Sequence, residues 1–416
     1  MLETPVNCWG PKLHKRVEPT SENDAPTIQR ALDQTHHRPT GFDYLRITLA
    51  TSVIAIHAVG VPYGQSALNA FATGPARPLV ASVMPMFFAL SGFLVAGSLL
   101  RSKTLIAFMG LRAIRIFPAL GAEVVLSALI LGPLLTVLPI KEYFSDPLFA
   151  RYLFNLIGHV QFVLPGVFSN NPIPNVINSQ LWTIPFELLC YISLGVLAII
   201  GAKKRRWIIL ASALVLEITI FIRDQPGSWL WKNTPDGHVS GKQLVVAFLL
   251  GVALYLYRDQ VRLRGWLFLL CGASSLILLC WPFGDYVAAF PIAYVTIYIG
   301  LLNPAKLKIL AGADFSYGVY LYGFPIQQTY ARLGILNVGT NLVLSLVTTA
   351  AVAALSWNLI EKPAQGLREP LKRLERLWLS LIRQTTDKGH AEDAAGTASL
   401  PLQPPSEDYV RPIAEI

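Results

Sequence analysis

The chain has 416 residues, of which 53% are hydrophobic and only 14% are charged, and its mean hydropathy is +0.48. Soluble domains carry about a quarter charged residues, so this composition excludes an ordinary soluble protein. It predicts an all-α bundle of membrane-spanning helices. The net charge of +9 would suit a nucleic-acid-binding protein, but its distribution along the chain follows membrane topology, and we expect no nucleic-acid partner.

The cysteines give no sign of a disulfide framework or a metal site. There are four of them, Cys8, Cys190, Cys271 and Cys280, without paired or metal-ligand spacing. Three lie in apolar runs, where a cysteine is usually a small core residue. We therefore expect neither disulfides nor a bound metal.

Residues 1–41 are polar and contain five prolines. No apolar segment follows an early basic cluster, so we expect no cleavable signal peptide. The composition predicts a disordered cytoplasmic tail, and the chain then enters the membrane with its own first helix.

Ten apolar runs follow, most of them close to the roughly 20 residues that cross a bilayer. They cover residues 43–63, 78–100, 114–138, 180–201, 207–222, 243–257, 265–282, 285–302, 311–333 and 340–360. Together they define a multi-pass membrane domain over residues 42–365, embedded in the lipid bilayer.

The basic residues support this layout. With the N-terminus inside, the inner segments hold nineteen Lys and Arg residues and the outer connections hold seven. Lys and Arg concentrate on the cytoplasmic side of membrane proteins. Ten spans then place both termini in the cytoplasm.

Four segments outside the spans differ from them in composition. Residues 139–179 predict an interfacial or re-entrant helix on the outer side, and residues 223–242 carry tryptophans typical of an interfacial belt. After the last span, residues 366–383 predict a basic amphipathic helix on the inner leaflet. Residues 384–416 predict a disordered cytoplasmic tail.

The first span carries an unusual set of ionisable residues, Asp43, Arg46 and His57. Arg46 and His57 are eleven residues apart, so on a helix they share one face at a separation of roughly 16 Å, and Asp43 falls close to the same face. An ionisable residue inside a membrane span points to function, and this arrangement suits a long anionic ligand. The alternative is an arginine that reaches the surface and a histidine that bonds a neighbouring helix.

The third span is predicted to begin next to Arg112 and Arg115, which are neighbours on one helix face. Two guanidinium groups at the positive end of a helix would bind phosphate. Ordinary anchoring on the cytoplasmic side is the alternative explanation.

Two further spans contain polar side chains. Glu187 lies in an apolar span and could orient a histidine, pair with an arginine or bond backbone freed by Pro185. Tyr317 and Tyr320 in the ninth span can supply hydroxyl groups to a polar cavity, or simply pack.

Six short motifs in order resemble those of one family. They are Arg46-x10-His57, the SGFL at Ser91–Leu94, the R-x-x-R at Arg112–Arg115, the L-W-x-x-x-x-E at Leu181–Glu187, the S-Y-x-x-Y-L at Ser316–Leu321 and the N-L-I-E-K-P at Asn358–Pro363. Over roughly residues 40–365 the chain resembles the acyltransferase-3 family of bacterial integral-membrane acyltransferases, in its stand-alone form. These enzymes O-acetylate polysaccharides, lipopolysaccharide and nodulation-type oligosaccharides. One departure is Gly323, where many members have a histidine.

The resemblance implies a multi-pass enzyme of the bacterial cytoplasmic (inner) membrane, with acetyl-CoA as donor, a glycan as acceptor and no metal. It implies that His57 is catalytic and that the three arginines contact coenzyme A. Ser91 and Tyr320 belong to matching motifs and are supporting candidates. The resemblance leaves open the glycan, its hydroxyl, a longer acyl donor and the oligomeric state.

We expect His57 to act as a general base or to form a transient acyl-histidine, with Glu187 or Asp43 fixing its tautomer. Glu187 is a second catalytic candidate. A transporter or flippase of a glycan or lipid-linked sugar is the alternative, since intramembrane charges occur there too. Against it, the sequence has no repeated half.

Overall fold

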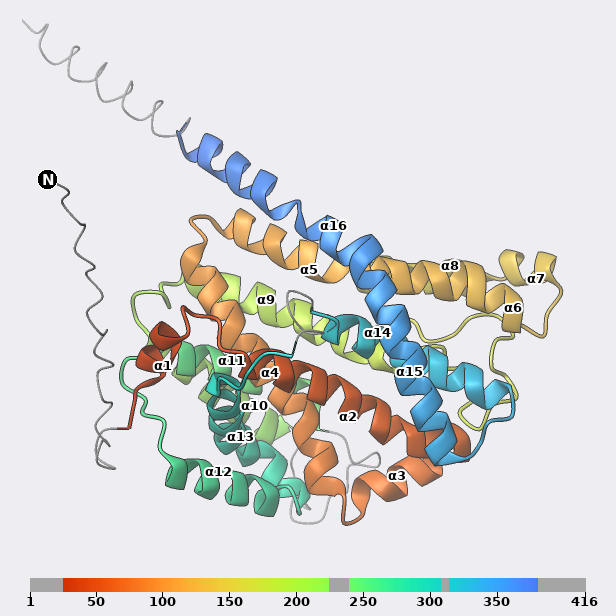
Figure 1. The fold of residues 1–416 in the computed structure, drawn as a ribbon, viewed down its shortest axis with the longest axis horizontal. Helices are drawn as coiled ribbons and strands as arrows, with labels where there is room; N and C mark the ends of the chain where they lie inside the picture. Colours follow the sequence, from red (N-terminus) through yellow and green to blue (C-terminus); the bar gives the residue numbers. More distant parts are fainter. Residues whose placement is uncertain (1–24, 224–238, 308–313, 381–416) are drawn as a thin grey trace, which may run out of the picture.

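The computed structural model describes residues 25–223, 239–307 and 314–380. Within these ranges the chain is helical and has no strand, only two isolated bridges. Five helical segments are long and apolar enough to cross a membrane, and three shorter apolar helices accompany them (Figure 1). The prediction of an all-α membrane protein is confirmed at this level, while ten spans and two cytoplasmic termini stay predictions.

Each of the ten predicted spans overlaps a helix. The helices are α1 (Ile28–Gln34), α2 (Gly41–Tyr63), α3 (Gln65–Thr73), α4 (Arg77–Arg101), α5 (Leu105–Leu126), α6 (Gly132–Leu135), α7 (Ile140–Ser145), α8 (Pro147–Tyr152), α9 (Ile184–Ile199), α10 (Trp207–Arg223), α11 (Gly241–Leu256), α12 (Gly265–Leu278), α13 (Asp285–Leu301), α14 (Ser316–Arg332), α15 (Val338–Ser356) and α16 (Lys362–Gln365). π-helical segments extend α5 (Ser127–Leu131) and α15 (Trp357–Glu361), and a 3-10 turn (Ser179–Thr183) precedes α9.

Helix α1 lies in the segment predicted to be a disordered tail. The Thr27 side chain caps it, and Ile28 and Leu32 are buried. The amide of Ile28 also donates to the carbonyl of Val261, 3.0 Å away, in the connection between α11 and α12. The prediction of disorder is therefore wrong for residues 25–40, because a short apolar face docks on this connection. Residues 1–24 lie outside the described residues.

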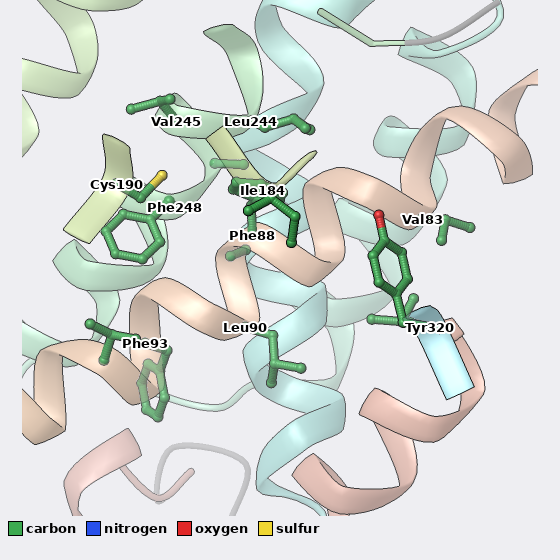
Figure 2. Packing of buried hydrophobic residues seen from close by; sticks show 14 of the residues in the cluster. Val83, Phe88, Leu90, Phe93, Ile184, Cys190, Leu244, Val245, Phe248 and Tyr320 are labelled. Atoms are coloured by element: carbon green, nitrogen blue, oxygen red, sulfur yellow. The ribbon is translucent and has the colours of Figure 1, made fainter. Parts of the chain in front are cut away.

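Helices α4 and α11 form the centre of the bundle, where aromatic residues such as Phe93 and Phe248 are buried (Figure 2). Two glycines let their backbones approach. A Cβ on Gly92 would collide with the backbone of Phe248, and one on Gly251 would collide with the backbone of Ala89. Small residues at a helix crossing are a common packing device in membranes, where lipid offers no hydrophobic drive for association.

Helix α5 begins nine residues earlier than the predicted start of the third span. Thr104 caps it by accepting a hydrogen bond from the amide of Ala107 at 3.1 Å, and Glu375 accepts from the Thr104 amide at 2.6 Å. The two arginines of this segment interrupted the apolar run and hid the first two turns. Arg112 and Arg115 consequently lie inside a helix and not in a connection.

The chain stays helical after α15, and helical residues continue to Ser380 (Figure 1). Of the predicted helix over residues 366–383, residues 368–380 are helical, after a turn at residues 366–367. It packs on the start of α5, where Leu371 lies against Gly110, and leaves Leu377 and Trp378 exposed. Its contact with the inner leaflet stays a prediction. The tail over residues 384–416 lies outside the described residues.

The two segments predicted to lie on the outer side are only partly described. Residues 139–179 form the short helices α7 and α8 and a 3-10 turn (Leu153–Ile157) in place of one continuous interfacial helix. Asn155 explains the break, because its side chain bonds the backbone of Tyr152 and Gln161 and folds the chain back on itself. Of the predicted outer segment 223–242, residues 224–238 lie outside the described residues.

A sharp turn joins α2 to α3. Gly64 has φ of +91°, a conformation that glycine adopts far more readily than residues with a Cβ. Its amide closes α2 by donating to the carbonyl of Gly60 at 2.6 Å. The turn folds α3 back beside the end of α2, and residues of α3 line a cavity there.

Candidate active site

Most of the candidate residues line one cavity of about 900 Å³, part of it open to solvent. We call it the arginine cavity. Helices α2, α4, α5, α9 and α14 supply its walls, which include Arg46, Ser91, Arg112, Arg115, Glu187 and Tyr320. The structure therefore brings together six of the eight predicted site residues. His57 and Asp43 lie outside this cavity.

Arg112 and Arg115 face the cavity together because residues three apart on a helix share a face. The predicted contribution of the helix dipole is wrong, however. Since α5 begins at Leu105, the two arginines lie two to three turns inside it, and the dipole effect is confined to the first turn. The positive charge in this cavity comes from the guanidinium groups themselves.

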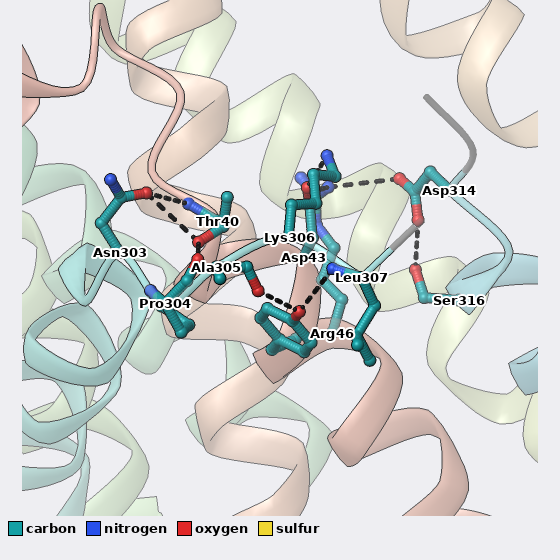
Figure 3. A network of polar contacts seen from close by, with 11 residues as sticks. Thr40, Asp43, Arg46, Asn303, Pro304, Ala305, Lys306, Leu307, Asp314 and Ser316 are labelled. Atoms are coloured by element: carbon teal, nitrogen blue, oxygen red, sulfur yellow. Dashed lines mark hydrogen bonds and ion pairs between the residues drawn. The ribbon is translucent and has the colours of Figure 1, made fainter. Parts of the chain in front are cut away.

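Asp314, immediately before α14, joins two of the arginines. Its carboxylate lies 3.2 Å from Arg46 and accepts a hydrogen bond of 2.5 Å from the hydroxyl of Ser316 (Figure 3). The same carboxylate lies 2.8 Å from Arg115. Burial by itself would raise the pKa of Asp314, but the two guanidinium groups and Ser316 outweigh it and hold the pKa well below its ordinary value. An anion is therefore already stable between Arg46 and Arg115.

Arg115 has a second acidic partner. Glu361, at the end of the π-helical segment that follows α15, lies 3.6 Å from its guanidinium group, and the ring of Tyr317 lies beneath it at 5.4 Å. A π-helical turn adds one residue to the repeat and is frequent at functional sites. Here it ends at the acid that holds Arg115.

Arg112 is less fully paired than Arg115. It donates to the hydroxyl of Ser98 at 3.2 Å and lies 5.9 Å above the ring of Tyr191. Its buried Nε has no hydrogen-bond partner among the described residues. Arg112 thus keeps donor capacity for a ligand.

His57 lines a different cavity of about 1390 Å³, again partly open to solvent. We call it the histidine cavity. The 3-10 turn before α9 supplies Gln180 and Trp182, and α3 supplies Gln65 and Asn69. Polar groups from two elements therefore line this cavity together with His57.

The His57 ring is held within its own helix. Its Nδ1 lies 2.8 Å from the carbonyl oxygen of Val53, and Phe324 packs edge-on against it at 5.2 Å. A carbonyl only accepts hydrogen bonds, so Nδ1 carries a proton. In the neutral imidazole Nε2 is then the nitrogen that accepts protons.

The structure gives Nδ1 a partner other than the two predicted carboxylates. Asp43 lies near the start of α2, 2.7 Å from Lys306 and 3.9 Å from Arg46 (Figure 3), and fourteen residues of helix, roughly 21 Å, separate it from His57. Glu187 lines the arginine cavity and accepts a hydrogen bond from Tyr191. The interpretation that either acid fixes the tautomer through Nδ1 is wrong, because the helix carbonyl already does so.

The two cavities meet at Met84 and Tyr320, which line both. The Tyr320 hydroxyl lies 2.7 Å from the hydroxyl of Thr183 and donates to the carbonyl of Gln180 at 2.9 Å. Tyr320 is thus fixed at the boundary. A ligand anchored by the arginines and extended past Tyr320 would point toward His57.

Sequence reasoning missed Asp314, Thr183 and Gln180 as residues of the site. An acid at the start of the tyrosine-rich ninth span, in a region otherwise rich in cations, was the available signal for Asp314. Thr183 and Gln180 flank the L-W motif but have no charge that would single them out. Among the described residues no group of three or more His, Cys, Asp or Glu side chains gathers as metal ligands would.

Comparison with known proteins agrees with this geometry. A family model described as an acyltransferase domain matches residues 40–360. The chain belongs to the acyltransferase-3 family. This acyltransferase is 28% identical over 337 residues to an O-acetyl transferase of Shigella phage Sf6, covering 78% of the chain and 96% of that protein. It is 30% identical over 372 residues to nodulation protein 10 of Rhizobium leguminosarum bv. viciae, covering 80% of the chain and 95% of that protein. No solved structure matches it.

The family resemblance predicted from the short motifs is therefore confirmed. The resemblance marked Gly323 as a departure from the pattern of many family members, and the structure shows what surrounds this glycine. A Cβ on Gly323 would lie 2.7 Å from Cγ1 of Ile54, which is too close unless the Ile54 side chain shifts. Glycine here permits the close packing of α14 on α2.

Proposed function

We propose that the protein is an integral-membrane O-acetyltransferase of the bacterial cytoplasmic membrane. It transfers an acetyl group from cytoplasmic acetyl-CoA to a hydroxyl group of a cell-surface or exported glycan. The name of the Sf6 relative, an O-acetyl transferase, supports the reaction. The observation that carries the proposal is the contact of the arginine cavity with the histidine cavity at Tyr320 and Met84.

The arginine cavity suits the donor. Coenzyme A carries phosphate groups at one end and a thioester at the end of a long pantetheine arm. Arg46, Arg112 and Arg115 offer charge-assisted hydrogen bonds to phosphate, and phosphate would replace the carboxylate of Asp314 between two of them. Helix geometry puts Arg46 roughly 16 Å from His57, a distance that a pantetheine arm spans.

The histidine cavity suits the transfer. Nε2 of His57 accepts the proton of the acceptor hydroxyl while its oxygen attacks the thioester carbonyl. The carbon–sulfur bond breaks, coenzyme A leaves as a thiolate that takes up a proton, and the product is an acetyl ester. Attack by Nε2 itself, through an acetyl-histidine, is the alternative course.

A test uses purified protein in liposomes with acetyl-CoA and bacterial cell-surface glycans. Release of free coenzyme A, matched by glycan-dependent formation of acetyl esters, is the expected result. A glycan transporter would release no coenzyme A and would instead move glycan across the bilayer. NMR comparison of surface glycans from a deletion strain and its parent identifies the acceptor.

A further inference from the structure

Gln180 is a buried side chain whose polar atoms are unused. The residue is 1% exposed, and neither its amide oxygen nor its amide nitrogen has a hydrogen-bond partner among the described residues. It lines the histidine cavity together with His57. An unsatisfied polar group in a protein interior is costly and calls for an explanation.

The position of Gln180 is fixed through its backbone. Its backbone amide donates to the side chain of Asn178 at 3.2 Å. Its backbone carbonyl accepts from the hydroxyl groups of Thr183 and Tyr320, at 3.2 and 2.9 Å. Asn178 is itself bonded to the carbonyl of Leu321 at 2.8 Å. The residue therefore lines the cavity wall at a fixed place, and its side-chain amide makes no hydrogen bond with the described residues.

A second buried glutamine shows the ordinary alternative. Gln328 is fully buried, and its amide bonds the carbonyls of Ile173 and Val176 at 2.9 and 2.8 Å and the side chain of Asn171 at 3.0 Å. These bonds tie α14 to the outer loop. Gln328 has a structural role that Gln180 lacks, although both lie in the same bundle.

The surroundings of Gln180 fit a sugar ring. A primary amide offers two donors and two acceptor sites, which match hydroxyl groups that donate and accept. The same cavity has an aromatic face in Trp182 and polar side chains in Asn69 and Ser179. Ligand sites typically combine an apolar wall with a few placed polar groups.

We propose that the histidine cavity is the binding site for the acceptor sugar, and that Gln180 hydrogen-bonds a ring hydroxyl and so orients the sugar toward Nε2 of His57. The inference deepens the proposed function and rests on it for the identity of the reaction. It makes Gln180 a determinant of acceptor binding, separate from the arginines that would hold the donor.

The test compares Gln180→Met with Gln328→Met in a detergent that has no sugar headgroup. Methionine has a similar length and shape and removes the amide. Gln180→Met should keep or raise the melting temperature, because it removes two unsatisfied groups, while Gln328→Met should lower it. Gln180→Met should also weaken binding of methyl pyranosides, measured by saturation-transfer NMR without acetyl-CoA, by about tenfold or more.

Deoxy sugars localise the contact. The wild type should bind a methyl pyranoside that lacks the hydroxyl bonded by Gln180 more weakly than it binds the parent sugar. Gln180→Met should bind the deoxy sugar and the parent sugar with equal affinity, because the contact is already lost. In transfer assays Gln180→Met should raise the acceptor KM and leave the acetyl-CoA KM unchanged.

Two outcomes overturn the inference. One is a loss of stability in Gln180→Met as large as in Gln328→Met, which would make the amide structural. The other is wild-type affinity of Gln180→Met for every pyranoside. Failure of the proposed function is distinct: pyranosides would bind through Gln180, yet no coenzyme A would be released.

Discussion

His57 is the residue on which the proposed chemistry depends. Because its ring is fixed by Val53 and Phe324, His57→Ala removes the base while the wall of the cavity remains. We predict a loss of transfer of about two to four orders of magnitude, the usual contribution of a general base. Acetyl-CoA binding by isothermal titration should stay at the wild-type value.

His57→Gln is the control for packing. Glutamine keeps much of the volume and some hydrogen bonding, so a merely structural histidine would be rescued by it, and a catalytic one would not. A well-folded His57→Ala protein that acetylates at nearly the wild-type rate would disprove the mechanism.

The arginines of α5 should differ from each other in a way that the sequence did not predict. Arg112→Ala and Arg115→Ala should each weaken donor binding by roughly ten- to hundredfold, since a lost charge-assisted contact costs about 1.5–3 kcal/mol. Only Arg115→Ala should also lower the melting temperature, because it leaves Asp314 and Glu361 without their shared partner.

Lysine at either position should restore donor affinity only in part, since the forked geometry of the guanidinium group is lost. Wild-type donor KM in both alanine variants would show that these arginines only anchor the helix.

Asp314 gives a pH dependence with a definite sign. Its pKa in the folded protein lies below the ordinary value of 3.8, so the ionised carboxylate stabilises the fold above about pH 4, and this stabilisation is lost as the pH falls further. Asp314→Asn should therefore melt below the wild type at about pH 7, and the difference should shrink toward about pH 3. A difference that is independent of pH would contradict the assignment.

At the residue scale, charge was the informative signal. The family resemblance implied that Arg46, Arg112 and Arg115 serve one ligand, and they do line one cavity. The partners of these residues were not predictable. Asp314 and Glu361 reach Arg115 only through the folding of α14 and α15 beside α5, and no spacing in the sequence encodes that contact.

At the scale of elements, the crossing of α4 and α11 leaves no room for a larger residue at its glycines. A methyl group at Gly251 would meet the backbone of Ala89, which does not move aside as a side chain does. We predict that Gly251→Ala destabilises the protein by about 1–3 kcal/mol or more, measured as a lower melting temperature in detergent.

Gly272 in α12 is the matched control. A Cβ there would meet nothing within 4 Å, so Gly272→Ala should be neutral or gain up to about 1 kcal/mol from helix propensity. Equal effects of the two alanines would show that the crossing is looser than described.

The helices themselves were largely predictable, because apolar runs of membrane length leave few alternatives. The prediction fails where a segment is polar in sequence but helical in the structure. Arg112 and Arg115 hid the start of α5, and prolines and polar residues hid α1, whose small apolar face matters only once Val261 lies beside it. Tertiary contact decided both cases.

At the scale of the whole molecule, the two cavities follow one another along α2. Arg46 lies in the second turn of α2 and His57 three turns further along it. In the predicted topology, with the N-terminus in the cytoplasm, the arginine cavity would meet the compartment of the proposed donor, and the histidine cavity would lie toward the outer side. The orientation of the bundle thus determines whether the proposed donor can reach its site.

We therefore predict that reporter fusions after Lys204 and Arg262 report a cytoplasmic position and that a fusion after Asn171 reports an external one. Lys204 and Arg262 lie in basic connections, and such connections are retained inside. Alkaline phosphatase, active only outside, and a fluorescent protein, bright only inside, give opposite signals at each point. An external signal at Lys204 would place the arginine cavity on the outer side, away from acetyl-CoA, and the donor proposed for this acyltransferase would be excluded.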